Sequence, residues 1–248
     1  METLAWRTDG RIGFLTLRRP QHYNAVDRGM MLELESFWQE RQHDDAVGVI
    51  VLDGGDAKGF CAGLDMKTLG PEVFGLPPAG IYEAQRRLAR LLLAMRRVPQ
   101  PIVCAVHGSA AGLGFSFAMA SDVRVVSEDA RFCAAYINIG LGGADMASSY
   151  FLPRLIGSGR AHEFLLTGDW MSAADALALG FASRVVPRDR LLETATGLAR
   201  TMVSKNPLGL RMTKEALNIS IDAGSLEACL ELEDRNQTLL ILARRQTS

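Results

Sequence analysis

The sequence has neither an excess of charge of one sign nor a long apolar run. It carries 27 Lys and Arg against 28 Asp and Glu, so no global basic field would attract nucleic acid or an anionic membrane. Local basic pairs such as Arg18-Arg19 are interpreted as solvated faces, although one pair could meet a phosphate. No apolar run approaches the length of about 18 residues that predicts a transmembrane helix. The N-terminal segment lacks the basic-then-apolar pattern of a signal peptide, which predicts a cytoplasmic protein with no membrane partner.

Cysteine and histidine are scarce, with four of each in 248 residues. Neither residue type shows the close spacing of metal ligands, so no metal site is expected. The simplest interpretation of the cysteines is that they are buried free thiols of a protein in a reducing cytoplasm. These residues are Cys61, Cys104, Cys133 and Cys229.

Apolar periodicity predicts strands that alternate with helices in the first half of the chain. Such alternation favours crossover units and an α/β core. With 248 residues and 48% hydrophobic composition, the chain can form one large domain, or one domain with an appendage. The run VGVIVL at residues 47–52 suits a strand buried on both faces. The expected strands cover residues 11–17, 47–52, 101–106 and 123–126, and the expected helices cover residues 28–43, 81–97 and 113–121.

Helices dominate the sequence from residue 158 onward. Asp27 and Ser172 are expected N-caps, because their side chains can accept hydrogen bonds from the first helical turn. Residues 70–80 contain two adjacent prolines and three glycines, which predict a loop and a candidate lid. The expected C-terminal helices cover residues 173–179, the stretch after Pro187 to about 205, the stretch from 207, and residues 225–245.

Two glycine-containing turns, at residues 60–65 and 108–114, each place backbone N–H groups at or near the start of a helix. If the turns converge, these N–H groups and the helix dipole can stabilise a developing oxyanion. Taken alone, the spacing favours ordinary turns. Neither turn matches the G-x-G-x-x-G dinucleotide pattern or the phosphate-binding loop.

Five segments resemble, in the same order, signature segments of the enoyl-CoA hydratase/isomerase (crotonase-like) superfamily. Residues 59–67 and 102–122 resemble its two oxyanion segments. The match extends over nearly the whole chain, and five segments together are far more specific than any one of them. The segments are RRPQHYNAV (18–26), GFCAGLDMK (59–67), IVCAVHGSAAGLGFSFAMASD (102–122), FLLTGDWMSAADALALGFASRVVP (164–187) and NPLGLRMTKEALN (206–218).

This resemblance implies a crotonase-like α/β fold. Residues 1–190 would form a spiral of ββα units with an acyl-CoA site, and residues 191–248 a C-terminal helical region that mediates trimerisation. The protein would be a homotrimer or a homohexamer. Its substrate would be an acyl-CoA thioester with no other cofactor, because coenzyme A is part of the substrate. The last helix offers apolar residues for such assembly, namely Leu226, Leu230, Leu232, Leu239 and Leu240.

The resemblance also assigns residues around the thioester. The backbone N–H groups of Leu64 and Leu113 would hold the thioester oxygen. The family more often has Gly at the second position, and Leu113 could instead be a core residue. Lys67 could meet a phosphate of coenzyme A as a point charge, or could be an ordinary solvated side chain. The positions assigned to substrate binding are Ala25, Ala62, Gly63, Asp65, Met66, Lys67 and Gly112.

The chain departs from the family pattern where a hydratase has two glutamates that hold and activate water. The corresponding positions are Ser116 and Tyr136, and neither side chain is a base near neutral pH. The loss of one acid–base group typically lowers the rate by about 10²–10⁴. Ordinary hydration is therefore not the leading expectation. Both residues are also compatible with structural roles, in the helix and in the core.

One carboxylate remains in this region, at Asp145. A similar Asp occurs in dienoyl-CoA isomerases and 4-chlorobenzoyl-CoA dehalogenases, so Asp145 is the expected general base or nucleophile. It precedes an apolar segment and could instead be a helix N-cap. The leading expectation is double-bond isomerisation. The alternatives are weak hydration, thioester hydrolysis, dehalogenation and non-catalytic binding of coenzyme A.

Overall fold

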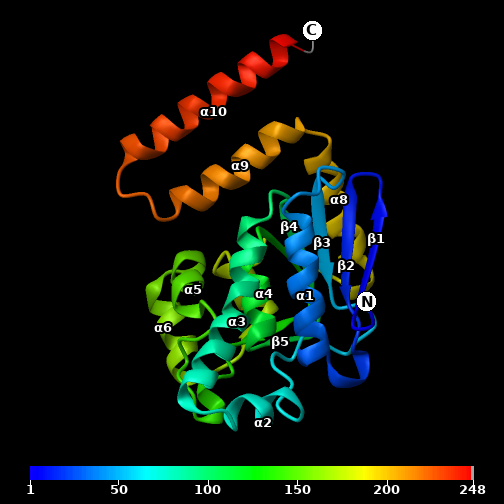
Figure 1. Ribbon diagram of the computed structural model, residues 1–248, viewed down its shortest axis with the longest axis vertical. Helices are drawn as coiled ribbons and strands as arrows, with labels where there is room; N and C mark the ends of the chain where they lie inside the picture. The colour runs from blue at the N-terminus through cyan, green and yellow to red at the C-terminus, as the bar shows by residue number, and fades with distance from the viewer. Residues whose placement is uncertain (247–248) are drawn as a thin grey trace.

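Two β-sheets form the framework of the computed structural model, which describes residues 1–246. In the larger sheet, only the first pair of strands is antiparallel and the other neighbours are parallel (Figure 1). Its order is β1 (Leu4–Asp9), β2 (Ile12–Leu17), β3 (Val49–Asp53), β4 (Ile102–Val106), β6 (Val123–Ser127) and β9 (Arg184–Val186). The smaller sheet consists of β5 (Ser109–Ala111), β7 (Arg131–Cys133) and β8 (Met171–Ser172).

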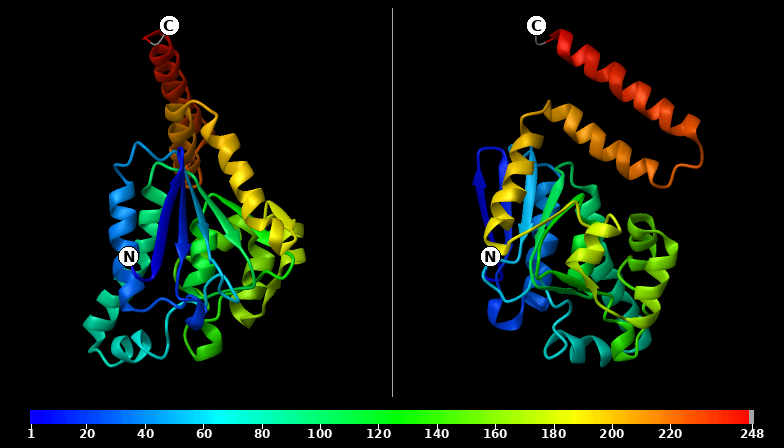
Figure 2. Two further views of the ribbon diagram at one scale, coloured as in Figure 1. Left: turned by 90° about the vertical axis from the view of Figure 1, so that its right-hand side faces the viewer. Right: turned by 180° about the vertical axis from the view of Figure 1, so that it is seen from behind.

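The strands of the larger sheet have apolar side chains on both faces. In β3, Ile50 and Leu52 enter one apolar cluster, whereas Val49 and Val51 enter another. Helix α8 covers the face of the second cluster, and α1 and α3 cover the opposite face (Figure 2). The apolar run at residues 47–52 therefore forms a strand buried on both faces, which confirms the prediction. The bounds of these helices are Arg28–Arg41 for α1, Pro78–Arg97 for α3 and Leu191–Val203 for α8.

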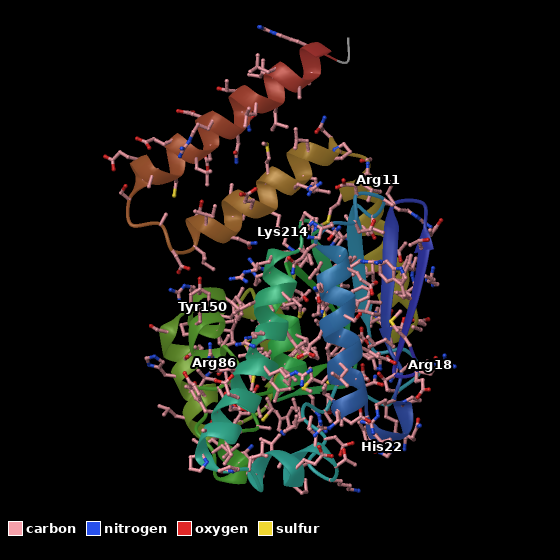
Figure 3. All side chains as sticks on the ribbon, viewed as in Figure 1. Arg11, Arg18, His22, Arg86, Tyr150 and Lys214 are labelled. Carbon is pink, nitrogen blue, oxygen red and sulfur yellow. The ribbon has the colours of Figure 1, made fainter. Side chains whose placement is uncertain are left out.

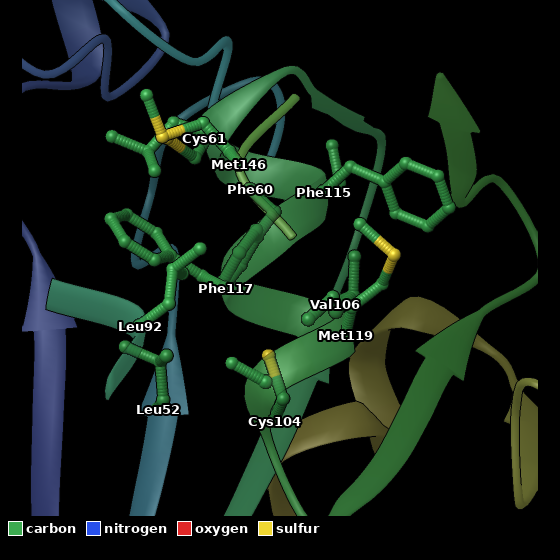
Figure 4. Packing of buried hydrophobic residues seen from close by; sticks show 14 of the residues in the cluster. Leu52, Phe60, Cys61, Leu92, Cys104, Val106, Phe115, Phe117, Met119 and Met146 are labelled. Atoms are coloured by element: carbon green, nitrogen blue, oxygen red, sulfur yellow. The ribbon is translucent and has the colours of Figure 1, made fainter. Parts of the chain in front are cut away.

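Helix α4 (Leu113–Ala120) lies in the interior, and all eight of its residues are buried. Phe115, Phe117 and Met119 pack among apolar side chains from β3, β4 and α3 (Figure 4). The ring of Phe115 also contacts Phe132, with centroids 5.6 Å apart. Because a close-packed interior resists displacement, this packing fixes the N-terminus of α4 relative to both sheets.

Residues 70–80 do not form the loop that their prolines and glycines predict. Helix α2 (Leu69–Phe74) occupies the first half of this segment, and α3 begins at Pro78. Proline is well tolerated at the first position of a helix, where its missing N–H would have no intrahelical partner. Leu69 and Val73 are buried and hold α2 against the core. The prediction of a loop at this point is wrong.

Both predicted helix caps are confirmed. The Asp27 side chain accepts a hydrogen bond of 2.8 Å from the backbone N–H of Met30 at the start of α1. Ser172 and Asp175 form a reciprocal capping box at the start of α7 (Ala173–Ala178). The core also contains helices α5 (Ser148–Ile156) and α6 (Ser158–Thr167). Its three short 3-10 helices among residues 1–246 are η1 (Pro20–His22), η2 (Ile137–Ile139) and η3 (Arg188–Arg190).

The last two helices, α9 (Pro207–Ser220) and α10 (Leu226–Gln246), form a hairpin that projects from one end of the molecule (Figures 1 and 2). The sequence predicts that the C-terminal helical region begins at residue 191, which is the start of α8. In the structure, Leu191 and Ala195 pack α8 against the larger sheet, so α8 is part of the core. The projecting region therefore begins at α9. Residues 247–248 of the predicted region lie outside the described residues.

Helix α9 is attached to the core by Lys214, whose side chain is buried (Figure 3). Its Nζ lies 2.9 Å from the Asp122 carboxylate and donates to the carbonyl of Gln100 at 2.8 Å. In α10, by contrast, Leu226 and Leu239 are 72% and 52% exposed. No helix within residues 1–246 has both the length and the apolar composition needed to cross a bilayer.

Candidate active site

Asn24 anchors the first glycine-containing turn. Its side chain is fully buried, and its Nδ2 donates to the carbonyl oxygens of Gly54 (2.8 Å) and Phe60 (3.0 Å). Its Oδ1 accepts from the backbone N–H of Arg19 at 2.8 Å. Asn24 has a φ of 53°, a conformation that asparagine adopts more readily than most residues. One side chain thereby holds both ends of the loop that leads into the turn.

Arg19 is buried beneath the same turn rather than solvated. Its guanidinium lies 3.0 Å from Asp65 and 3.1 Å from Asp27. The backbone N–H groups of Lys67 and Thr68 donate to the other oxygen of Asp65, at 3.1 and 3.2 Å. Burial alone would raise the pKa of Asp65, but the hydrogen bonds from Arg19 and the two amides outweigh it and keep that pKa below its ordinary value. The Asp65 carboxylate therefore stabilises the turn, and its backbone N–H is also engaged, because it donates to the carbonyl of Val26 at 2.9 Å.

The two glycine-containing turns converge, as the oxyanion hypothesis requires. Cys61 and Ala110 form an isolated parallel bridge. The N–H of Cys61 donates to the carbonyl of Ser109 at 3.2 Å, and the N–H of Ala111 donates to the carbonyl of Cys61 at 2.9 Å. These hydrogen bonds join segments that lie about 50 residues apart in the chain, so they fix the relative position of the two turns.

The turns approach so closely that several positions, Gly63 and Gly114 among them, accept only glycine. A Cβ atom on Gly114 would lie 2.2 Å from the carbonyl oxygen of Cys61. A Cβ atom on Gly63 would lie 2.8 Å from the carbonyl oxygen of Ala111 and 3.2 Å from the nitrogen of Leu113. Gly63 also has a φ of 90°, which residues with a side chain rarely adopt. The backbone of the first turn is thus in contact with the amide that begins α4.

The peptide geometry sets the direction of the Leu64 N–H group. Val26 donates its backbone N–H to the carbonyl of Gly63 at 2.7 Å. In a trans peptide, the N–H of the following residue points opposite to that carbonyl. The Leu64 N–H therefore points away from Val26, on the side where the first turn contacts the second.

The N–H group of Leu113 is directed by the same rule. The carbonyl of Gly112 accepts from the N–H of Ser116 at 3.0 Å, inside the first turn of α4, so the Leu113 N–H points out of the helix N-terminus. No protein group in the described part of the chain accepts the N–H of Leu64 or of Leu113. The Leu113 side chain is itself in the core, so its core position and a donor role for its amide are compatible.

Ser116 and Tyr136 form a buried pair of hydroxyl groups. The Ser116 Oγ and the Tyr136 Oη are 3.1 Å apart. The Tyr136 ring lies beside the second turn, since a Cβ atom on Gly112 would be 3.5 Å from Tyr136 Cε1. Burial raises the pKa of Tyr136, and the negative charge of Asp145 raises it further. Tyr136 is therefore protonated and can act only as a hydrogen-bond partner, as the sequence suggests.

Asp145 lies in the segment between η2 and α5. Its carboxylate accepts hydrogen bonds from the Nε2 of Gln85, at 3.1 Å to Oδ1 and 3.2 Å to Oδ2. Its Oδ1 also accepts from the backbone N–H of Met146 at 2.8 Å.

Asp145 is not the N-cap of α5. Ala147 occupies the cap position, with a φ of 62°, and no side chain caps the helix. The backbone N–H of Asp145 donates to Ser148 Oγ at 3.1 Å, whereas its carboxylate is directed to Gln85. The N-cap alternative for Asp145 is therefore wrong, and the carboxylate has no capping role that would explain its presence.

The positions expected to contact the substrate differ in their exposure to solvent. Lys67 is exposed, and its ammonium group has no ion-pair partner among residues 1–246. Among the same residues, no three His, Cys, Asp or Glu side chains are arranged to hold a metal ion. Ala62, Met66 and Lys67 are exposed, Leu64 is half-buried, and Ala25, Gly63, Asp65 and Gly112 are buried.

A cavity of about 460 Å³ lies between α3, α5 and the segment after α9. Ala147, at the cap position of α5, and Ala89, one turn beyond Gln85 on α3, are among its lining residues. Most of its other lining side chains are apolar, so it can accept an apolar group. They include Leu92, Leu93, Tyr150, Phe151 and Ile221.

Comparison with known proteins decides the family. The family model for enoyl-CoA hydratase/isomerase matches residues 7–246. The chain belongs to the enoyl-CoA hydratase/isomerase family. It is 38% identical to a probable enoyl-CoA hydratase of Mycobacterium bovis over 93% of this chain and 82% of that protein. It is 31% identical to the 1,2-epoxyphenylacetyl-CoA isomerase of Escherichia coli over 96% of this chain and 90% of that protein.

The crystal structure of an enoyl-CoA hydratase from Bacillus anthracis superposes on this family enzyme with a TM-score of 0.90. The two sequences are 27% identical, and the superposition covers 96% of this chain and 91% of the other. The predicted crotonase-like α/β fold is thereby confirmed. The relatives include both hydratases and isomerases, so family membership establishes an acyl-CoA enzyme without fixing its reaction.

Sequence reasoning missed three residues that organise the site, namely Arg19, Asn24 and Gln85. Arg19 and Asn24 lie in the segment RRPQHYNAV, whose match to the family was the available signal. Gln85 lies on an amphipathic helix among many polar residues, and nothing in its spacing distinguishes it from a solvated side chain.

Gly114→Ala tests the close approach of the two turns. The added methyl group would meet the carbonyl oxygen of Cys61 at 2.2 Å, and backbone atoms cannot move aside as a flexible side chain can. We expect the variant to lose about 3 kcal/mol or more of unfolding free energy, measured by urea denaturation. Gly197→Ala in α8 is the control, because nothing lies within 4 Å of its Cβ position, and it should be neutral or slightly stabilising. Equal stabilities would contradict the close packing described for the turns.

Proposed function

We propose that this family enzyme moves a double bond within an acyl-CoA thioester, with Asp145 as the group that carries the proton. The N–H groups of Leu64 and Leu113 would donate to the thioester oxygen. Two converging N–H donors without protein acceptors support this role, because charge on that oxygen develops during the reaction.

The reaction would proceed in two proton transfers. The Asp145 carboxylate removes a proton from a carbon conjugated with the thioester, and the electron pair of that C–H bond moves through the π system onto the thioester oxygen. The Leu64 and Leu113 amides stabilise the resulting enolate. The protonated Asp145 then returns its proton to a different carbon of the same system. The double bond is shifted, and no water or redox equivalent is consumed.

The observation that carries the choice of isomerisation over hydration is the hydroxyl pair of Ser116 and Tyr136. These residues stand where a hydratase of the family has the two glutamates that activate water. They are buried and hydrogen-bonded to each other. With Asp145 as the one carboxylate that supports acid–base chemistry here, one proton can be moved between carbons, but no pair of carboxylates holds a water. The similarity to an isomerase of Escherichia coli supports the same class.

Slow hydration is the second candidate reaction, because relatives named as hydratases match over most of the chain. Thioester hydrolysis and dehalogenation would instead use Asp145 to activate a water or as a nucleophile, and a non-catalytic protein would only bind the thioester. A panel of enoyl-, dienoyl- and aryl-CoA substrates in D₂O, followed by mass spectrometry, separates these functions. Isomerisation shifts the double bond, which chromatographic separation before the mass spectrometer resolves, and it introduces deuterium to the extent that the protonated Asp145 exchanges with the solvent. Hydration adds the mass of D₂O, and binding alone changes nothing.

We further propose that the exposed Lys67 contacts a phosphate of coenzyme A and that Ala25, Ala62 and Met66 line the rest of that site. No cofactor other than the coenzyme A of the substrate takes part in this proposal. The free cysteines, of which Cys61 and Cys104 are fully buried, support a reducing compartment such as the cytoplasm.

We expect a homotrimer, or a homohexamer formed from two trimers. The support is α10, which projects from the core and exposes Leu226, Leu230 and Leu239, because an apolar face of this kind favours burial against a second copy. Light scattering at micromolar concentration should give three or six times the mass of the 27.0 kDa chain. A monomeric mass would contradict this expectation.

Asp145→Asn tests the proposed base. The substitution keeps the shape of the side chain and removes its basicity, so kcat on the best substrate of the panel should fall by about 10²–10⁴. Binding of the acyl-CoA should persist, because the lost interaction acts in the transition state. Asp169→Asn is the control, since that Asp is exposed and outside the site. Double-bond migration at the wild-type rate by the Asp145 variant would show that another group carries the proton.

Hydration of crotonyl-CoA tests the assignment of Ser116 and Tyr136. Without the two glutamates, we expect turnover to be lower by about 10²–10⁴ than that of a two-glutamate family hydratase assayed in parallel. The disappearance of the conjugated enoyl absorbance provides the rate. A turnover equal to that of the reference hydratase would mean that other groups hold the water and that isomerisation is not the main activity.

A further inference from the structure

The Gln85–Asp145 contact joins two elements that lie 60 residues apart in the sequence. Gln85 is on α3, and Asp145 is in the segment before α5. The Gln85 Nε2 is almost equally far from both carboxylate oxygens, 3.1 Å from Oδ1 and 3.2 Å from Oδ2. Both residues are half-buried, so the contact is partly shielded from competing water.

The backbone around Asp145 restricts the carboxylate further. Met146 and Ala147 both have positive φ values, 44° and 62°, which cost free energy for residues with a side chain. Ser148 Oγ accepts from the N–H of Asp145 at 3.1 Å and donates to the carbonyl of Gly143 at 3.2 Å. The segment is therefore held in an unfavourable backbone conformation by contacts on both sides of Asp145.

We propose that Gln85 is a positioning residue, which holds the Asp145 carboxylate in the orientation needed for proton transfer. This inference rests on the proposed function of Asp145 as the base. Oδ1 receives two hydrogen bonds, from Gln85 and Met146, whereas Oδ2 receives only the longer one from Gln85. Oδ2 is thus the oxygen with more unused lone-pair capacity, and it is the one assigned to take the proton.

A carboxamide suits this position better than a charged donor. Its Nε2 donates to the carboxylate before the proton moves, and after rotation its Oε1 can accept from the carboxylic acid formed in the reaction. It supports both protonation states without adding a charge of its own. An Arg or Lys in its place would stabilise the carboxylate strongly and weaken it as a base.

The charged groups of α3 near Gln85 are engaged elsewhere. Arg86 lies 3.1 Å from Glu83, and Arg87 lies 2.6 Å from Glu35 of α1. From the element that precedes Asp145, the titratable group coupled to its charge is Tyr136, which stays protonated. A change in the pH dependence of a Gln85 variant can therefore be attributed to the Gln85–Asp145 contact.

Gln85→Ala and Gln85→Glu test the proposal on the best substrate of the panel. Gln85→Ala frees the carboxylate, so kcat should fall roughly tenfold to 10²-fold while KM stays unchanged. Gln85→Glu places a second carboxylate at the contact. A like charge disfavours ionisation, so the acidic limb of the kcat/KM profile should move to higher pH by about one unit or more. Glu83→Gln, on the same helix, is the control and should change neither quantity.

A double-mutant cycle separates positioning from an independent role. If Gln85 acts through Asp145, Gln85→Ala should cause no further loss of kcat in an Asp145→Asn background. An equal loss in both backgrounds would overturn the proposal. Urea denaturation of each variant is the structural check. A structural role would give a different result. In that case, Gln85→Ala would lose kcat and also unfold at a lower urea concentration, and Gln85→Glu would keep the wild-type pH profile. This combination would show that the proposal is wrong.

The two hypotheses fail in different ways. Full activity of Asp145→Asn would contradict the proposed function itself. An inactive Asp145→Asn, combined with Gln85 variants that match Glu83→Gln in kcat and pH profile, would overturn only the positioning role.

Discussion

The site depends on one backbone contact, the pairing of Cys61 with the strand at Ala110. This pairing joins the two turns whose N–H groups face the same region, and it is possible only because Gly63 and Gly114 have no side chain at the point of closest approach. The buried α4 fixes one turn, and Asn24 fixes the other. A pair of backbone donors held by the core in this way needs little reorganisation when charge develops on a bound substrate, which is the condition for electrostatic stabilisation of an oxyanion.

Under the proposed function, the acid–base groups around this fixed element differ from those of a two-glutamate hydratase. The hydroxyl groups of Ser116 and Tyr136 would stand in place of the glutamates, and the carboxylate would be supplied by Asp145, which is hydrogen-bonded to Gln85 of α3. The same thioester activation can then serve a different reaction, because the position and number of carboxylates decide whether a water or only a proton is handled. The relatives of this chain include proteins named as hydratases and a protein named as an isomerase, so more than one reaction occurs within the family.

Features that depend on residues close together in the chain could be predicted from the sequence. The apolar run at residues 47–52 predicts the central strand β3, and Asp27 is predicted as the N-cap of helix α1, because burial and capping depend on near neighbours in the chain. The glycines indicated the two turns, and the family resemblance supplied their expected role and led to Asp145. The burial of Arg19 and the contact of Gln85 could not be predicted, since each depends on a carboxylate distant in sequence. Helix α2 was not predicted, because the prolines and glycines of its segment indicate a loop and the burial of Leu69 and Val73 is not evident from the sequence. Strand β1 was not predicted, because half of this edge strand is exposed and polar.

The central claim is that the amides of Leu64 and Leu113 polarise the thioester carbonyl. The most direct test is infrared difference spectroscopy of a bound acyl-CoA whose thioester carbonyl carries ¹³C, compared with the same compound in water. Two hydrogen bonds from amides in a water-poor site should weaken the C=O bond and lower its stretching frequency below the value in water. A bound carbonyl that absorbs at the solution frequency or above it would contradict the account.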